Sequence, residues 1–461
     1  MESASDELSQ LRARLDAAER MIVEQDARIQ KLLEIIDSLQ RGNKRQAAPF
    51  SKGPPKPDPK PPGRKPGDSY GRHAHRAIPP HIDETYDAPL PLHCPGCSGE
   101  VIFEKIEPQY QTEIPRQPIH RQFNVHVGSC SCCRKRVQGR HRLQTSNALG
   151  AANSQIGPDA QALAVLLNKN AGLSHGKIRR FFHDAFGIGI ARATPARTML
   201  RAAVRLLPAY GEIQIAVKNS GWVVPDETGW KVGGLLQWMH VFVTEKATLY
   251  LIRPSRGFDV PREALGANYS GDMTHDGWSV YDQFYDAHHG TCNGHLLVRC
   301  NRLLETATGG AVNFPRHIKA LLHAGLAVRN ARAAGRLSLF KSTVLADVLT
   351  SRLKKLCGPK THPGNERFAK FLHWNCCDVF RYLSRPNLHA TNWLAEQALR
   401  PAIVNRKVWG GNRTDNGAHA QGVIASVLRT LAQNGQKALD YLAQTFRAQP
   451  GKAPQLLSPA I

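Results

Sequence analysis

Three carboxylates far apart in the chain have the residue type and surroundings of ligands for a hard divalent cation. Asp226 follows a short apolar strand, Asp276 ends a later predicted strand, and Glu396 lies in a helical pattern. Mg²⁺ takes carboxylate oxygens and keeps water and substrate phosphates in its other positions. Two such ions stabilise both the attacking and the leaving oxygen of a phosphoryl displacement. These residues therefore predict phosphoryl transfer with two Mg²⁺ ions, which Mn²⁺ could replace.

Composition alone leaves the choice of acids open. Four other acidic residues could replace a member of the set: Glu227, Asp272, Asp282 and Glu305. Asp226 and Asp276 could also be turn or cap residues at strand ends. Glu396 has the spacing of a surface i,i+4 ion pair with Arg400, which is common on helices.

A second candidate site consists of two Cys-x-x-Cys pairs: Cys94 with Cys97, and Cys130 with Cys133. Four thiolates presented by two tight turns suit a tetrahedral Zn²⁺, and the pattern predicts a zinc ribbon. With four protein ligands, this ion would stabilise the fold and have no catalytic position. Cys132 could displace Cys130 or Cys133, His93 and His126 are weaker substitutes, and free or redox-active cysteines are the alternative.

The charge of the chain points to a polyanionic partner. The 461 residues hold 61 Lys or Arg and 37 Asp or Glu, a net charge of +24. A catalyst of small neutral metabolites needs no such excess, whereas double-stranded DNA attracts it and gives a steep salt dependence. No apolar run reaches the length of a membrane span, and the polar N-terminus is not an export signal. We therefore expect a cytoplasmic protein with no membrane contact and no disulfide framework.

The elements that must position the acids alternate between strands and helices. Strands are predicted at 222–224, 236–244, 248–252 and near 271–274, with a helix over 258–265. Residues 295–384 read as helical, and 418–446 as one or two amphipathic helices broken near Asn434 and Gly435. This pattern indicates an α/β core with additional helices.

The N-terminal half divides into four segments. Residues 1–41 carry apolar positions every seven residues, which predicts a coiled coil and homo-oligomerisation; a helix packed on its own chain is the alternative. Residues 42–85 form a basic linker, with ten prolines and ten Lys or Arg between 41 and 80. The zinc ribbon spans 86–145. Residues 150–212 predict a helix-turn-helix-like DNA-binding region, or an ordinary helical hairpin, with three basic residues on its second helix: Lys177, Arg179 and Arg180.

Five short segments together form a recognisable pattern. They are Asp226-Glu227-Thr228-Gly229-Trp230, His275-Asp276-Gly277-Trp278, Cys292-Asn293-Gly294-His295, Asn392-Trp393-Leu394-Ala395-Glu396 with the residues that follow to Pro401, and Asn405-Arg406-Lys407-Val408-Trp409-Gly410-Gly411-Asn412-Arg413. In this order they resemble transposases of insertion-sequence family 66, and the resemblance extends over nearly the whole chain.

The resemblance implies an RNase H-like catalytic domain of the DDE type over 213–412. A helical insertion would occupy about 302–388, and a C-terminal helical domain 413–461. Asp226, Asp276 and Glu396 become the metal-binding triad. His295, which matches the family's Cys-x-x-His signature together with Cys292, would support the site or be a structural histidine. The resemblance also implies DNA contacts for five residues that follow Glu396 in the chain: Arg400, Arg406, Lys407, Trp409 and Arg413. Trp409 could stack on a base or pack in the core.

The function expected from the resemblance is DNA transposition. The protein would bind terminal inverted repeats, pair its protomers through the coiled coil, and carry out metal-dependent cleavage and strand transfer. Small accessory proteins of the same element would be further partners. A non-catalytic DNA-binding regulator and a structure-selective nuclease are the alternatives.

Overall fold

The computed structural model of the chain describes residues 78–93, 95–112, 114, 117–144, 155–448 and 454–457, and six helical residues between 21 and 32. Most of the predicted coiled coil and most of the predicted linker therefore lie outside the described residues. Tertiary contacts divide the chain into two units, 1–115 and 116–461. In the first, a single bridge pairs His93 with Glu100 around the turn that holds Cys97.

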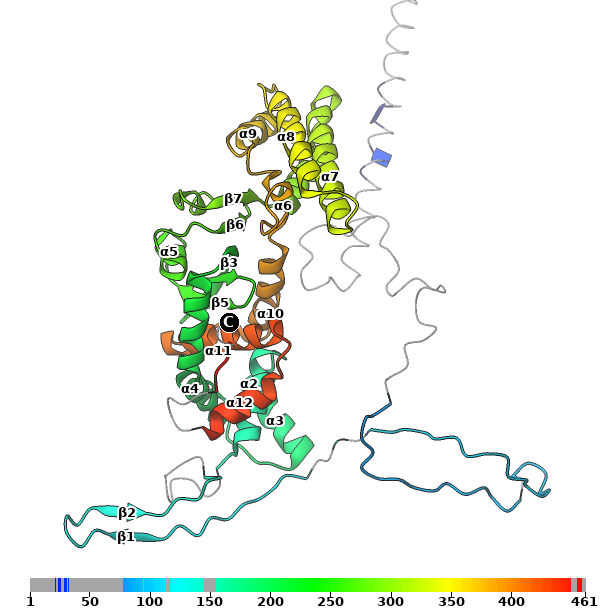
Figure 1. Cartoon of the computed structure of the whole chain (residues 1–461), viewed down its shortest axis with the longest axis vertical. Coiled ribbons are helices and arrows are strands. Elements are labelled where there is room, and N and C mark those ends of the chain that lie inside the picture. Colours follow the sequence, from blue (N-terminus) through cyan, green and yellow to red (C-terminus); the bar gives the residue numbers. More distant parts are fainter. Residues whose placement is uncertain are drawn as a thin grey trace, which may run out of the picture. The chain divides into compact units, whose positions relative to one another are not determined.

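The second unit contains a five-stranded mixed sheet in the order β5-β4-β3-β6-β7 (Figure 1). Its strands are β3 (Trp222–Val232), β4 (Leu235–Val243), β5 (Thr248–Arg253), β6 (Asp272–His275) and β7 (His288–Thr291). β3, β4 and β5 are antiparallel neighbours, whereas β6 is parallel to both β3 and β7. β3 is therefore the central strand, with an antiparallel partner on one side and a parallel one on the other.

The structure corrects two expectations about the strands. The strand expected at 222–224 continues to Val232, because a hairpin at Gly233 and Gly234 pairs it with the whole of β4. Asp226 consequently lies within this strand and does not follow it. β7 was not predicted, because His288–Thr291 has no apolar run; it is a strand through its pairing with β6.

Both faces of the sheet are covered by helices. On one face, Val223, Phe242 and Leu249 pack with α4 (Ala193–Lys218), α5 (Asp259–Leu265) and α11 (Asp415–Gln433). On the other face, Val224 and Val241 pack against α10 (Trp393–Trp409). Neighbouring strand residues thus point to opposite faces, and both faces are apolar because both are buried.

The helical insertion has a core of its own. It comprises α6 (Asn293–Thr306), α7 (Asn313–Ala333), α8 (Leu339–Leu356) and α9 (Pro363–Trp374), and it lies between β7 and α10 in the chain. Ile318, Leu322, Leu353 and Phe368 are fully buried among these helices. A separate core allows the insertion to fold without interrupting the sheet.

The remaining helices pack beside α4. They are α2 (Pro158–Lys169), α3 (His175–Phe186) and α12 (Ala438–Arg447). α4 continues past Pro208 to Lys218, because Ala209, Tyr210 and Ile213 extend its buried face. Within the described part of the chain, no helix is long and apolar enough to cross a membrane.

Candidate active site

Asp226 lies within β3, and Asp276 directly follows β6, the parallel neighbour of β3. The two strands pair through Trp222 with Asp272 and Val223 with Met273. Burial raises the pKa of Asp226 to about 7, and the carboxylates of Glu227 and Asp276 act in the same direction. The negative charges of Asp226 and Asp276 would therefore repel each other unless a cation or a proton compensates them.

Glu396 lies close to His295, which also interacts electrostatically with the two aspartates. It lies in the first turn of α10, and its Oε1 is 3.9 Å from Nε2 of His295 on α6. The pKa of His295 is raised to about 9, first by its hydrogen bond to Cys292 and then by the charges of Asp276 and Glu396. The ion pair between Glu396 and Arg400 is not among those formed by the described residues. The three predicted acids and His295 thus share one site.

A buried pair, Cys292 and Asn392, lies next to this site and contacts Asp226. The Cys292 thiol donates to Asn392 Oδ1 at 3.1 Å, and the Asn392 backbone N–H donates to Cys292 Sγ at 3.3 Å. Asn392 Nδ2 lies 3.5 Å from Asp226 Oδ2. Asn392 was not predicted as a site residue, although it occurs in the recognised segment before Glu396. It connects the start of α10, the start of α6 and the middle of β3.

Two of the alternative acids have other partners. Glu227 is buried and paired with Arg256 at 2.7 Å, and it also accepts a hydrogen bond from Tyr281 at 3.0 Å. Asp272 is buried and paired with Arg385 at 2.6 Å. Because both carboxylates are neutralised by arginine, they are poor candidates for metal ligands. Glu305 is exposed near the end of α6.

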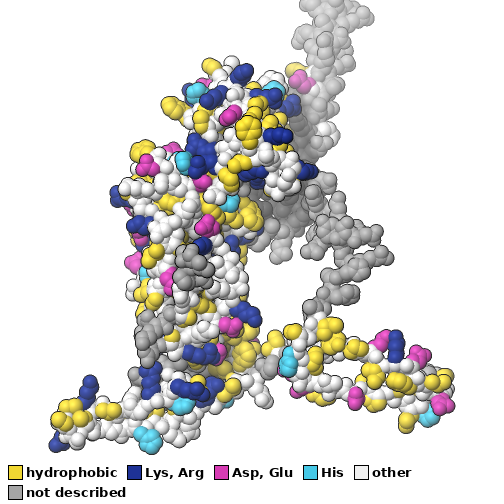
Figure 2. Space-filling model, in the orientation of Figure 1, with side chains coloured by type: hydrophobic (Ala, Val, Ile, Leu, Met, Phe, Trp, Pro, Cys, Tyr) yellow, Lys and Arg dark blue, Asp and Glu magenta, His cyan; other side chains and the backbone are white. Residues whose placement is uncertain are grey.

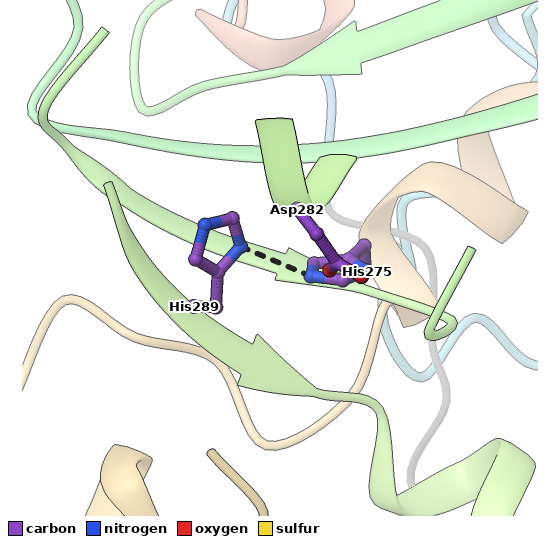
Figure 3. A group of neighbouring side chains, drawn as sticks. All are labelled: His275, Asp282 and His289. Atoms are coloured by element: carbon purple, nitrogen blue, oxygen red, sulfur yellow. Dashed lines mark hydrogen bonds between the residues drawn. The ribbon is translucent and has the colours of Figure 1, made fainter. Parts of the chain in front are cut away.

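Asp282, the fourth alternative, belongs to a different group. Its carboxylate and the rings of His275 and His289 offer ligand atoms within 4.8 Å of one another (Figure 3), a donor set that suits a transition metal. However, the Gly277 N–H donates to His275 Nδ1, so a neutral His275 carries its proton on Nε2, which faces His289 Nδ1 at 3.1 Å. While the Gly277 hydrogen bond is kept, a metal at Nε2 would leave this ring without a proton on either nitrogen. We therefore interpret the group as a hydrogen-bonded pair that orients the end of β6.

The predicted DNA-contacting residues fall into two groups. Six are exposed: Arg400, Lys407, Arg413, Lys177, Arg179 and Arg180. The other two contact the protein itself. Arg406 donates to the carbonyl of Gly229 and to Thr228 Oγ1, and Trp409 packs edge-to-face on Trp230 at 5.9 Å. Packing in the core, the alternative considered for Trp409, agrees with this position.

The cysteines of the predicted zinc ribbon are described only in part. Cys94 lies outside the described residues, and Cys97 belongs to the unit 1–115. In the second unit, β1 (Val127–Ser129) and β2 (Arg136–Gln138) form a hairpin whose turn holds Cys130 and Cys133. Backbone N–H groups of this turn lower the pKa of Cys130. This favours a thiolate, as a zinc ligand requires, and the four-cysteine set remains a prediction.

The donor set formed by the three acids fits Mg²⁺. Asp226, Asp276 and Glu396 supply carboxylate oxygens only, which is the ligand type this ion prefers. The raised pKa of Asp226 indicates that its charged form lacks compensation within the protein. A divalent cation would provide that compensation.

The fold and the site define an α/β protein with one acid within the central strand, one directly after its parallel neighbour and one on a helix. Comparison with family models agrees with this class: residues 153–420 match the model described as Transposase IS66 family, and the chain belongs to that family. This membership confirms the resemblance found in the sequence and makes the protein a transposase of an insertion sequence. No curated protein matches the chain.

Proposed function

We propose that the protein binds the terminal inverted repeats of its insertion sequence, cuts DNA at the element ends and joins the freed 3′ ends to target DNA. The catalytic core would be RNase H-like and of the DDE type, with Asp226, Asp276 and Glu396 as its acids. One observation carries this proposal. Acids from β3, from the end of β6 and from α10 lie around the same histidine, His295.

The topology supports an RNase H-like assignment. Strand order β5-β4-β3-β6-β7 places an antiparallel hairpin on one side of the central strand and parallel strands on the other. The first acid lies on the central strand and the second follows its parallel neighbour. The helical insertion separates them from α10, which carries the third acid.

The residues of the site divide the work between them. Mg²⁺ or Mn²⁺, when bound by the three carboxylates, would activate the attacking oxygen and stabilise the leaving oxygen of an in-line displacement. His295 keeps its proton at neutral pH because its pKa is about 9, so it can donate a hydrogen bond to a phosphate oxygen. Asn392 orients Asp226. Neither a covalent protein–DNA intermediate nor ATP is needed.

Basic side chains near the site would bind the phosphates of DNA. Residues 313–374 of the insertion hold twelve Lys or Arg but only two acids, and dark blue side chains recur over these helices in Figure 2. Arg400, Lys407 and Arg413 are exposed at α10 and just after it. Such surfaces neutralise phosphates and release counterions.

The other predicted partners complete the proposal. The coiled coil would pair protomers so that two element ends meet, and a structural Zn²⁺ held by the cysteines would stabilise the ribbon. Lys177, Arg179 and Arg180 on α3 would contact the end DNA. Small accessory proteins of the same element would act with the transposase.

The proposal is tested with isosteric variants of the acids. Asp226→Asn, Asp276→Asn and Glu396→Gln should each lower Mg²⁺-dependent cleavage of inverted-repeat DNA by at least about 10³-fold, because the cation site is lost. Binding of the same DNA in a mobility-shift assay should change little. Glu305→Gln, an exposed acid on α6, is the matched control and should cleave normally.

The products separate the proposal from its two alternatives. A transposase joins labelled 3′ ends to a target plasmid, whereas a structure-selective nuclease cuts branched DNA and joins nothing. A regulator binds the repeat but does not nick it. Cleavage that survives in all three acid variants would show that the triad is assigned wrongly.

A further inference from the structure

A pocket opens beside the acidic site, on the side of the helical insertion. It encloses about 320 Å³, at the lower end of the ~300–1,000 Å³ typical of small-ligand sites. Its walls come from the turn after β6, from α6 and from α9, including Asp276, Trp278, His295, Arg299, Arg302 and Phe371. The pocket therefore shares Asp276 and His295 with the candidate active site.

One wall of the pocket is a row of basic residues. His295, Arg299 and Arg302 are spaced i, i+4 and i+7 on α6, so they share one face and extend over about 10 Å. Neither arginine forms an ion pair or a side-chain hydrogen bond with any residue that the structure describes. Arg299 has the rings of Phe368 and Phe371 beside it, each centred 5.0 Å from its guanidinium carbon, and Arg367 is a further cation near it. The row is therefore available to an anionic ligand.

The aromatic lining of the pocket adjoins both this row and the acidic site. Gly277, directly after Asp276, has a φ of +91°, and a Cβ there would lie 2.7 Å from Phe371 Cζ. The ring of Phe371 thus packs on the backbone of the turn that follows Asp276. Trp278 follows, held by the Arg256 guanidinium, whose central carbon is 3.8 Å from its ring centroid.

We propose that this pocket holds one unstacked nucleotide of the element-end DNA, next to the phosphate that is cut. Phe371 and Trp278 would contact the base, and Arg299 and Arg302 its flanking phosphates. The volume suits a single nucleotide and excludes a duplex. Aromatic and arginine side chains together are typical of sites for unpaired bases. This inference rests on the proposed function, because the ligand is the DNA end that the acids cut.

The test uses full-length protein and end DNA with single abasic sites placed at successive positions on either side of the cut. Phe371→Leu keeps apolar volume but removes the ring. Its cleavage of fully paired DNA should fall about tenfold or more, because stacking no longer offsets the cost of extracting the base. An abasic site at one position should restore cleavage, since no base then has to be extracted. If Phe371→Leu only damaged the fold, an abasic site in the DNA would not restore its cleavage.

Two further variants complete the experiment. Trp374→Leu alters an exposed aromatic on the same helix that does not line the pocket, and it should cleave like the wild type. Arg302→Gln, an exposed change that should leave folding intact, should weaken DNA binding and lower the salt slope by about one, without rescue by an abasic site.

The outcomes are distinct. Suppose that the wild type cleaves, that Phe371→Leu cleaves equally well and that Arg302→Gln binds DNA equally well. The nucleotide-binding role of the pocket would then be overturned, and the proposed function would remain intact. A loss in Phe371→Leu that no abasic position restores would also overturn it. Wild-type protein that cuts no end DNA would overturn both.

Discussion

At the scale of single residues, Asn392 and Cys292 determine where Asp226 lies. Asn392 is fully buried, and its side chain contacts Cys292 and Asp226. A buried amide that loses its partner costs about 1–3 kcal/mol, and it is then free to turn away from the carboxylate. The pair is therefore a positioning device for the acidic site.

Substitution of Cys292 tests this role. Cys292→Ala should lower the free energy of unfolding by about 1–3 kcal/mol and cleavage by about tenfold or more, whereas Cys292→Ser should retain most of both. Cys300→Ala is the matched control, because Cys300 is equally buried on α6. It should lose stability without a comparable loss of cleavage in assays run well below the melting temperature. Equal cleavage by the two alanine variants would contradict the role given to Cys292.

At the scale of elements, α10 and β3 are fixed to each other at both ends. Glu396 lies at the start of α10, opposite the acids of the sheet. Beyond its other end, the Asn412 N–H donates to the Lys231 carbonyl and the Gly233 N–H donates to the Asn412 carbonyl, both at 2.9 Å. These bonds need a tight turn through Gly410 and Gly411, whose φ angles are +84° and +119°. The spacing between acids on different elements depends on this connection.

The two glycines provide a matched pair of variants. A Cβ on Gly411 would lie 2.3 Å from the Lys231 carbonyl oxygen, whereas a Cβ on Gly410 would meet nothing within 4 Å. Gly411→Ala should therefore lower the free energy of unfolding by at least about 3 kcal/mol, and Gly410→Ala by only about 1 kcal/mol. Denaturant titration measures the difference, and equal losses would show that the turn is not held as described.

At the scale of the whole molecule, Lys169 joins the N-terminal helices of the second unit to α10 and α11. It ends α2, and its Nζ donates to Gln421 of α11 at 2.6 Å and lies 5.2 Å from the ring centroid of Trp409. Asn405 of α10 donates to its carbonyl at 2.8 Å. Burial lowers the pKa of Lys169 from 10.5 to about 7. A buried ammonium without a carboxylate makes this junction sensitive to pH.

The pH dependence has a defined sign. Between pH 7 and 10.5 the unfolded chain keeps the Lys169 proton that the folded chain has released, so this residue makes stability rise with pH. Below pH 7 its destabilising effect is complete and constant. Lys169→Met should therefore exceed the wild type in stability most at pH 7 and below. The difference should shrink by about 2–4 kcal/mol by pH 10.

Thermal or denaturant unfolding of both proteins across this range measures the difference. Lys437→Met, which changes an exposed lysine, is the control and should follow the wild type. A difference that does not vary with pH would contradict the assignment.

The sequence by itself determined the features that depend on neighbouring residues. The hairpin strands β4 and β5, the helix that carries Glu396 and the family's short segments follow from local periodicity and spacing. The three acids were assigned from short segments that are recognisable only in combination, and their role stays a prediction. The family match over 153–420 agrees with that recognition.

Only the tertiary structure decided the features that depend on contacts between distant segments. β7 is a strand because β6 lies beside it, and Asn392 is a site residue because Cys292, a hundred positions earlier, reaches it. The pocket beside Asp276 exists because Phe371 of the insertion packs on Gly277. Local patterns are set by steric preference and side-chain period, whereas burial and pairing appear only when remote parts of the chain exclude water together.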